Sequence, residues 1–189
     1  RRHLRSISSR SPVRILGVTG LVGRRLLARL ADHPWFEVVE AAASDRSVGV
    51  SLQALMDRGR EESGRSSDTR LAGAVRSLDG GFSAPLLVSA LPSSVARDTE
   101  RRLAEAGHLV VSNASAHRAD PRVPLVMADV NPDHMQLLGE GGGIATNPNC
   151  SVATFAPPLA RLHRAFGVEA VSVTTFQAVS GAGEGGPTV

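Results

Sequence analysis

A single cysteine, Cys150, lies where its sulfur could act as a nucleophile. It stands in TNPNCSVATF, directly after a proline-asparagine step. A free cysteine is often buried and inert, but this one follows an expected strand and precedes a helical stretch that extends to Gly167. The positive end of a helix favours the thiolate, which is the reactive form. The pattern therefore predicts covalent catalysis by Cys150, although Pro157 and Pro158 predict that the helix starts late or is kinked.

A glycine-rich turn near the amino terminus has the spacing of a dinucleotide-binding site. Gly17, Gly20 and Gly23 lie where the apolar run VRILGVTG meets the amphipathic stretch LVGRRLLARLADH. In such a turn the first glycine permits a tight bend, the second lets backbone approach a pyrophosphate, and the third lets the helix pack on the strand. The unpaired N–H groups at the start of the helix would hold the phosphates. A glycine-rich turn without a ligand is the alternative.

The residues after the second expected strand, SDRS, stand where the ribose of a bound adenosine would be recognised. An acidic residue there favours NAD through the 2′-hydroxyl, whereas an arginine accommodates the 2′-phosphate of NADP. Asp45 and Arg46 are adjacent, so their spacing alone leaves the choice between the two cofactors open.

Apolar runs that alternate with helical stretches predict how these residues are positioned. Helices are expected over 21–33 and 93–107, the second with Ser93 or Ser94 as N-cap. Residues 52–81 are polar and predict a short helix, a mobile loop and one further strand. This order is typical of an α/β protein with a doubly wound parallel sheet of the Rossmann type, whose loops meet at the carboxyl edge. The main expected strands cover residues 13–20, 36–44, 85–92, 108–114, 124–130 and 144–148.

The pattern changes at both ends of the chain. Residues 1–12 are rich in arginine and serine and free of acids, which is typical of a disordered terminus or the remnant of a transit peptide. Residues 13–149 are expected to form the nucleotide-binding domain. Residues 150–189 are expected to open a second domain, with a strand over 168–180. We expect this second domain to be incomplete and the chain to be an inactive portion of a longer enzyme.

Composition excludes several function classes. All 21 basic residues are arginine, so Schiff-base catalysis and a P-loop lysine are excluded within this sequence. Aromatic residues make up 3%, which argues against nucleic-acid binding by stacking. No apolar run approaches the ~20 residues of a membrane-spanning helix, and the histidines lack metal-ligand spacing, so no metal is expected. A lone cysteine predicts a reducing, cytoplasmic location, or an organelle such as a plastid if residues 1–12 are a transit-peptide remnant.

Seven motifs follow one another over residues 13–189, namely GVTGLVG, ASDRSVG, SALPSS, SNASAHR, VPLVMADVN, TNPNCS and TFQAVSGAG. Together they resemble the aspartate-semialdehyde dehydrogenase family, in particular its archaeal and fungal type. The resemblance implies a Rossmann domain followed by an α+β catalytic and dimerisation domain, and a homo-oligomer, either dimer or tetramer. It implies that NADPH reduces the acyl phosphate 4-phospho-L-aspartate to L-aspartate 4-semialdehyde, with release of phosphate, in lysine, methionine and threonine biosynthesis.

The resemblance also implies roles for individual residues. Cys150 matches the family's nucleophile, Gln177 matches the glutamine that orients the acyl intermediate, and Asn149 lies in a substrate-side motif. Arg46 matches a position that holds the 2′-phosphate, which favours NADP. The expected cofactor-binding residues are Gly17, Thr19, Gly20, Leu21, Val22, Gly23, Ser44, Arg46, Ser47, Ser89, Leu91, Pro92, Asn113, Ser180, Gly181 and Gly183.

Two alternatives stay open at this point. N-acetyl-gamma-glutamyl-phosphate reductase uses the same chemistry, but its cysteine usually follows a proline-glycine step, whereas Cys150 follows Pro148 and Asn149. A non-catalytic protein with an inactive Rossmann domain is the second alternative. Such a protein would bind NADPH tightly and would lack a reactive thiol at Cys150.

Overall fold

One parallel sheet of six strands organises the part of the chain that the structure describes. The structure is a computed structural model, and it describes residues 10–64, 69–139 and 141–177. The strand order is β3-β2-β1-β4-β5-β6, and all neighbouring strands are parallel. The doubly wound α/β sheet that the sequence predicts is thereby confirmed. The strands are β1 (Ser11–Leu16), β2 (Phe36–Ala43), β3 (Arg76–Ser77), β4 (Leu86–Ser89), β5 (Leu109–Ser112) and β6 (Gly143–Thr146).

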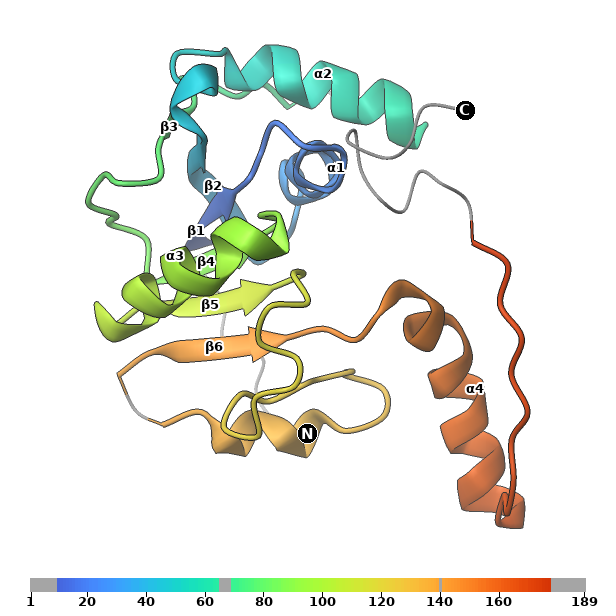
Figure 1. Ribbon diagram of the computed structural model, residues 1–189. Coiled ribbons are helices and arrows are strands. Elements are labelled where there is room, and N and C mark those ends of the chain that lie inside the picture. Colours follow the sequence, from blue (N-terminus) through green and yellow to red (C-terminus); the bar gives the residue numbers. More distant parts are fainter. Residues whose placement is uncertain (1–9, 65–68, 140, 178–189) are drawn as a thin grey trace, which may run out of the picture.

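Helices connect most of the strands and continue the chain after β6 (Figure 1). The short helix and the further strand expected within residues 52–81 are confirmed as α2 and β3. In the described part of the chain, no helix is long and apolar enough to cross a membrane. The α-helices are α1 (Leu21–Leu30), α2 (Leu52–Ser63), α3 (Ser93–Glu105) and α4 (Cys150–Phe166), and two 3-10 turns are η1 (Asp45–Ser47) and η2 (Pro132–Leu137).

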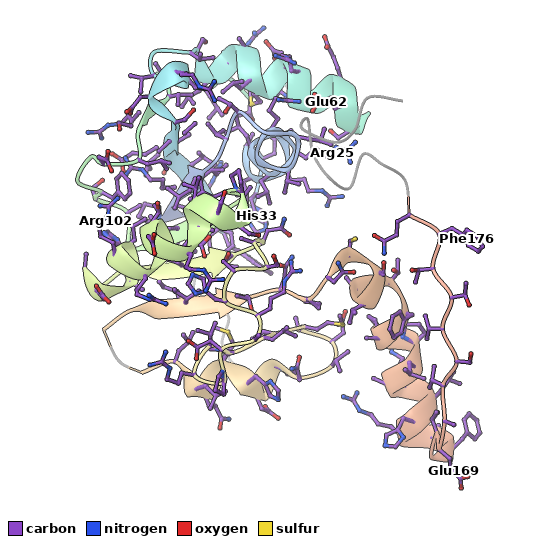
Figure 2. The ribbon with its side chains drawn as sticks, in the orientation of Figure 1. Arg25, His33, Glu62, Arg102, Glu169 and Phe176 are labelled. Atoms are coloured by element: carbon purple, nitrogen blue, oxygen red, sulfur yellow. The ribbon has the colours of Figure 1, made fainter. Side chains whose placement is uncertain are left out.

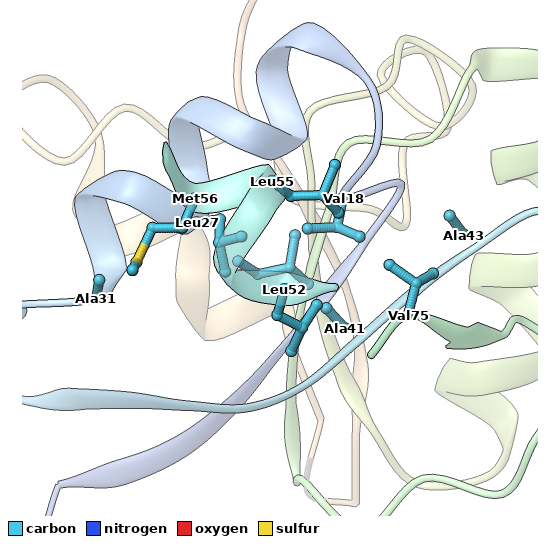
Figure 3. Packing of buried hydrophobic residues seen from close by; sticks show 10 residues of the cluster. Val18, Leu27, Ala31, Ala41, Ala43, Leu52, Leu55, Met56 and Val75 are labelled. Carbon is cyan, nitrogen blue, oxygen red and sulfur yellow. The ribbon is translucent and has the colours of Figure 1, made fainter. Parts of the chain in front are cut away.

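The first half of the core lies between the sheet and the helices α1 and α2. Successive side chains of a strand point to opposite faces, so Ile15 of β1 and Ala41 of β2 face these helices. They pack with Leu27 of α1 and with Leu55 and Met56 of α2, as Figure 3 shows for the last four of these residues. Burial of each large aliphatic side chain stabilises the fold by about 1.5–3 kcal/mol. This packing holds α1, and with it the glycine-rich turn, against β1.

The second half of the core lies on the opposite face, under α3. Leu16, Leu87 and Val110 are fully buried and pack with Ala96 and Leu103 of α3. Strands β1 and β2 are thus covered on both faces, as is usual for a parallel sheet, whereas Val111 of β5 is exposed on the face opposite α3. Helix α4 differs, because it lies beyond β6 and none of its residues is buried (Figure 1).

Arg14 of β1 is fully buried and pairs with Glu40 of the neighbouring strand β2. Nη2 of Arg14 lies 2.9 Å from Oε2 of Glu40, and its guanidinium carbon lies 3.5 Å from the centre of the Phe82 ring. Arg76 of β3 binds the other carboxylate oxygen of Glu40. Burial lowers the pKa of Arg14 from its ordinary value to about 10, so the guanidinium stays charged at neutral pH. One carboxylate therefore balances two cations from neighbouring strands.

The prediction of a strand over residues 124–130 is wrong. In this segment only Leu125 forms a bridge, an isolated parallel one to Thr146 of β6. The side-chain oxygen of Asn131 then accepts a hydrogen bond from the N–H of Met127 at 2.8 Å, and its amide donates to the carbonyl of Leu125 at 2.9 Å. An asparagine that bonds to nearby backbone in this way favours a turn over a strand.

Two expectations about the chain after β6, a late start of the helix and a strand that begins at residue 168, are also wrong. Helix α4 begins at Cys150 and includes Pro157 and Pro158, so the prolines do not delay its start. Residues 168–177 form no strand, and residues 178–180 lie outside the described residues. The segment runs alongside α4 (Figure 1), and no described strand pairs with it. A strand needs such a neighbour for its backbone hydrogen bonds.

Candidate active site

The loops that follow β1 and β4 meet at the carboxyl edge of the sheet. Because the strands are parallel, the loop after every strand leaves at this edge. Successive strands are added on one side of β1 up to β3 and on its other side from β4 onward, so the strand order reverses between β1 and β4. A side chain at Gly17 would place its Cβ 2.7 Å from the carbonyl oxygen of Ala90. Gly17 also has a φ of +74°, a conformation that favours glycine. Sheets of this kind bind ligands in the crevice at such a reversal.

The start of α1 presents free backbone donors beside the glycine-rich turn. A Cβ at Gly23 would collide with the carbonyl oxygen of Gly17, so the helix packs directly on the turn. Gly20 is the N-cap and makes no side-chain capping bond. Within the described residues, no hydrogen bond occupies the N–H groups of Leu21, Val22 and Gly23. Such donors at the positive end of a helix suit an anionic pyrophosphate.

The residues expected to recognise the ribose differ in what they are free to bind. Oδ1 of Asp45 accepts a hydrogen bond from the hydroxyl of Ser77 at 2.7 Å, so β3 engages the carboxylate. Arg46 is exposed and makes no hydrogen bond or ion pair with the other described residues. Ser44 and Ser47 flank it, with the N–H of Ser47 bonded to the carbonyl of Ser44 at 2.8 Å. An engaged carboxylate beside an available guanidinium favours a phosphate over a ribose hydroxyl.

The loop after β4 offers a ligand its backbone rather than its side chains. Ser89 and Leu91 are both buried, and the hydroxyl of Ser89 accepts a hydrogen bond from the N–H of Leu91 at 3.5 Å. Pro92 is exposed and is the N-cap of α3. Of the three, Pro92 is thus the residue whose side chain a cofactor could contact.

The prediction that Ser93 or Ser94 is the N-cap of α3 is wrong, because both residues lie inside the helix and Pro92 is its N-cap. The hydroxyl of Ser93 lies 2.8 Å from that of Ser115 and accepts a hydrogen bond from the N–H of Ser115 at 3.2 Å. Ser93 therefore ties the loop after β5 to the start of α3, close to the expected cofactor residue Asn113.

Cys150 is exposed and stands at the first position of α4. Asn149 is the N-cap, and its side-chain oxygen accepts a hydrogen bond from the N–H of Ser151 at 2.9 Å. The same oxygen lies 3.8 Å from the sulfur of Cys150. An accessible thiol on the first turn of a helix has the environment of a reactive cysteine. The buried, inert alternative for this residue is excluded.

Gln177 lies beside the first turn of α4, although it is far from Cys150 in the sequence. Its amide nitrogen donates a hydrogen bond to the hydroxyl of Ser151 at 2.9 Å. The structure therefore places Gln177 against Ser151, the residue that follows Cys150 in the chain. The expected cofactor residues Ser180, Gly181 and Gly183 lie outside the described residues.

Arg118 is a further cation at this edge, to which the sequence analysis assigns no role. Its Nη2 donates hydrogen bonds to the carbonyl of Asn113 at 2.7 Å and to Oδ1 of Asn147 at 3.5 Å. Asn147 in turn donates to Oδ1 of Asn113 at 2.8 Å. The motif SNASAHR contains Arg118, but Asn147 is 29 residues away from it, and nothing in the sequence signals that contact. The network joins the ends of β5 and β6, just before Cys150.

A family profile described as "Semialdehyde dehydrogenase, NAD binding domain" matches residues 12–138. The chain belongs to the semialdehyde dehydrogenase family. The match covers the glycine-rich turn, the SDRS segment and the loop that carries Arg118, and it ends before Cys150. The resemblance that the seven motifs indicate is thereby confirmed.

Named relatives of this semialdehyde dehydrogenase chain cover it almost completely. The aspartate-semialdehyde dehydrogenase of Archaeoglobus fulgidus is 40% identical in an alignment 183 residues long, which covers 92% of this chain and 52% of that protein. A crystal structure of the Candida albicans enzyme with NADP is 31% identical with a TM-score of 0.70, and the match covers 85% of this chain and 48% of that one. Aspartate semialdehyde dehydrogenase II of Vibrio cholerae complexed with ASA is 27% identical with a TM-score of 0.77, over 94% and 49% of the two chains. The chain thus spans about half the length of these relatives.

Proposed function

We propose that the chain is the cofactor-binding and nucleophile-bearing half of an aspartate-semialdehyde dehydrogenase. The full-length protein would use NADPH to reduce 4-phospho-L-aspartate to L-aspartate 4-semialdehyde and would release phosphate. The observation that carries this proposal is the exposed thiol of Cys150 on the first turn of α4, which follows β6 at the same edge of the sheet as the glycine-rich turn.

The described residues fit a bound NADPH at two points. The free N–H groups at the start of α1 suit the pyrophosphate, and the exposed guanidinium of Arg46 suits the 2′-phosphate, since arginine binds phosphate through charge-assisted hydrogen bonds. Asp45 does not compete for the ribose because its carboxylate is bonded to Ser77. We therefore favour NADPH over NADH. When bound, the cofactor supplies a hydride to the acyl carbon.

The proposed role of Cys150 is to divide one difficult reaction into two easier steps. Its thiolate attacks the acyl carbon of the substrate, a carbon–sulfur bond forms, and the carbon–oxygen bond to phosphate breaks. The resulting thioester is reduced, the carbon–sulfur bond breaks, and the thiolate is restored as the aldehyde leaves. The start of α4 favours the negative charge on sulfur at both stages.

Two neighbouring side chains support this chemistry. Gln177 is bonded to Ser151, so its amide lies next to the residue that would carry the acyl group, and we propose that it orients that group. The guanidinium of Arg118 is positioned by Asn113 and Asn147, and we propose that it attracts the phosphoryl group of the substrate. Removing a preorganised donor of this kind from an active site typically costs about 10²–10³ in rate.

A direct comparison of two acyl phosphates tests the proposed substrate. The full-length protein is incubated with NADPH and with 4-phospho-L-aspartate or N-acetyl-gamma-glutamyl phosphate, and NADPH oxidation is followed by absorbance. We expect oxidation with the first substrate only. Turnover of the second alone would identify the other reductase. NADPH binding without turnover of either would indicate a non-catalytic nucleotide-binding protein.

Replacing Arg46 with alanine is expected to weaken NADPH binding by about tenfold to a hundredfold, because a hydrogen bond to a charged group contributes ~1.5–3 kcal/mol. NADH lacks the 2′-phosphate, so its affinity should hardly change. Isothermal titration of both cofactors measures the two dissociation constants. Arg29→Ala, which removes an exposed arginine from the last turn of α1, is the matched control and should change neither. Equal losses for NADPH and NADH would mean that Arg46 is structural.

A further inference from the structure

An arginine is buried at the base of the glycine-rich turn. Arg24 is 3% exposed, and its Nε and Nη2 donate hydrogen bonds to Oε1 of Glu62 at 3.0 and 2.7 Å. These bonds hold the pKa of the Glu62 carboxyl below its ordinary value, so the pair is charged at neutral pH. Burying a guanidinium costs desolvation energy, which the half-buried carboxylate of Glu62 offsets through these hydrogen bonds. The contacts that Arg24 makes with the turn indicate what the buried cation does there.

The other side of the Arg24 guanidinium holds the turn itself. Nη1 donates a hydrogen bond to the carbonyl oxygen of Thr19. In the same peptide unit, the N–H of Gly20 donates to the carbonyl of Gly17 at 3.2 Å. A trans peptide is planar, and its C=O and N–H point in opposite directions. With both groups bonded, the orientation of the Thr19–Gly20 peptide is fixed.

This peptide decides where the free donors of α1 point. Gly20 is the N-cap of the helix, so the plane before it sets the direction of the N–H groups of Leu21, Val22 and Gly23. Arg24 itself is too buried to touch a ligand. Its effect on a bound pyrophosphate would pass through the backbone of the turn.

Helix α2 holds the arginine in place. A Cβ at Gly59 of α2 would collide with the carbonyl oxygen of Arg24, so the two helices touch at this turn. Three residues further, Glu62 reaches the Arg24 side chain, and Nη2 of Arg25 donates to the carbonyl of Glu62 at 3.4 Å. Figure 2 shows Glu62 near the end of α2 and Arg25 on the adjacent α1.

We propose that Arg24, held by Glu62, is a positioning residue that fixes the glycine-rich turn in its pyrophosphate-binding conformation. The proposal rests on the proposed function, because it requires a dinucleotide at the carboxyl edge. It gives α2, whose sequence carries no recognisable motif, a part in cofactor binding.

The test compares a ligand that has a pyrophosphate with one that lacks it. NADPH and 2′-AMP are titrated into the full-length protein and into its Arg24→Met and Glu62→Gln variants. We expect Arg24→Met to weaken NADPH binding by about tenfold or more, as for the loss of one ionic hydrogen bond, and Glu62→Gln to weaken it in the same direction. Binding of 2′-AMP relies on Arg46, and this ligand has no pyrophosphate for the glycine-rich turn to hold. Its affinity should therefore stay within about twofold of the wild-type value, because no hydrogen bond to it is lost. Glu61→Gln, the exposed neighbouring carboxylate, is the matched control.

The outcomes separate this inference from the proposed function. If the wild-type full-length protein fails to bind NADPH, the proposed function is overturned and the inference with it. If the wild-type protein binds and Arg24→Met or Glu62→Gln binds NADPH as tightly, only the inference is overturned. Equal losses for NADPH and 2′-AMP would also overturn it, since they would mean general damage to the domain. Should Arg24→Met fail to fold, Glu62→Gln decides, because it keeps the size of the side chain and removes only the charge.

Discussion

Replacing Cys150 with serine is expected to lower the turnover number of the full-length protein by on the order of 10⁴–10⁶-fold, the range seen when an enzyme loses its nucleophile. A serine hydroxyl is a weak nucleophile unless a base activates it. No described residue donates to or accepts from the position of the sulfur except Asn149, which is not a base. Steady-state assays with NADPH and 4-phospho-L-aspartate measure the change.

The control for this variant is cofactor binding. Cys150 lies on α4, whereas the expected contacts of NADPH with the described residues come from the loops after β1, β2, β4 and β5, so the dissociation constant of NADPH should stay that of the wild type. Iodoacetamide should inactivate the wild-type protein, and the acyl phosphate should protect it. Near-normal turnover by Cys150→Ser would rule out the nucleophile role.

Replacing Glu40 with glutamine is expected to lower the free energy of unfolding by about 3–5 kcal/mol, the usual cost of leaving a buried charge without its partner. Arg14 is fully buried and has Glu40 as its ion-pair partner among the described residues. With Glu40 in place the pKa of Arg14 is about 10, so the wild-type protein holds a charged pair near pH 7, and the variant would remove the carboxylate that balances the buried guanidinium. Urea denaturation followed by circular dichroism measures the loss.

Two further variants show whether charge balance is the cause. Arg14→Met removes the buried cation and leaves Glu40 paired with Arg76, so it should cost clearly less than Glu40→Gln. Glu37→Gln changes an exposed carboxylate on the same strand and should lie within about 0.5 kcal/mol of the wild type. If Arg14→Met proves as costly as Glu40→Gln, the account of this cluster is wrong.

Local sequence patterns predict most of the fold, because buried parallel strands are short apolar runs bounded by glycine and polar residues. They fail where a side-chain hydrogen bond or the lack of a neighbouring strand decides the structure. The run PLVMADV looks like a strand, but the side chain of Asn131 bends it into a turn. Residues 168–177 are rich in valine and threonine, yet they form no strand where no described strand lies beside them. Strand propensity describes how well a side chain fits a sheet, and it does not supply one.

The sequence likewise predicts only part of the candidate site. Glycine spacing predicts the turn at Gly17, because only glycine fits the left-handed φ and the close approach of Ala90. The long-range contacts of arginines could not be predicted. Arg24 meets Glu62 across 38 residues, and in a chain with 21 arginines no local pattern marks out Arg24 as a buried one. The catalytic role of Gln177 stays a prediction from the family resemblance.

The most direct test of the central claim is to trap the acyl group on Cys150. The full-length protein is mixed with 4-phospho-L-aspartate in the absence of NADPH, quenched in acid, digested and analysed by mass spectrometry, while released phosphate is measured in parallel. The account predicts an aspartyl thioester on the peptide that contains Cys150, together with one phosphate released per acylated site, and NADPH added before the quench should discharge it as aldehyde. Phosphate release with an unmodified Cys150, or an acyl group on any other residue, would contradict the account.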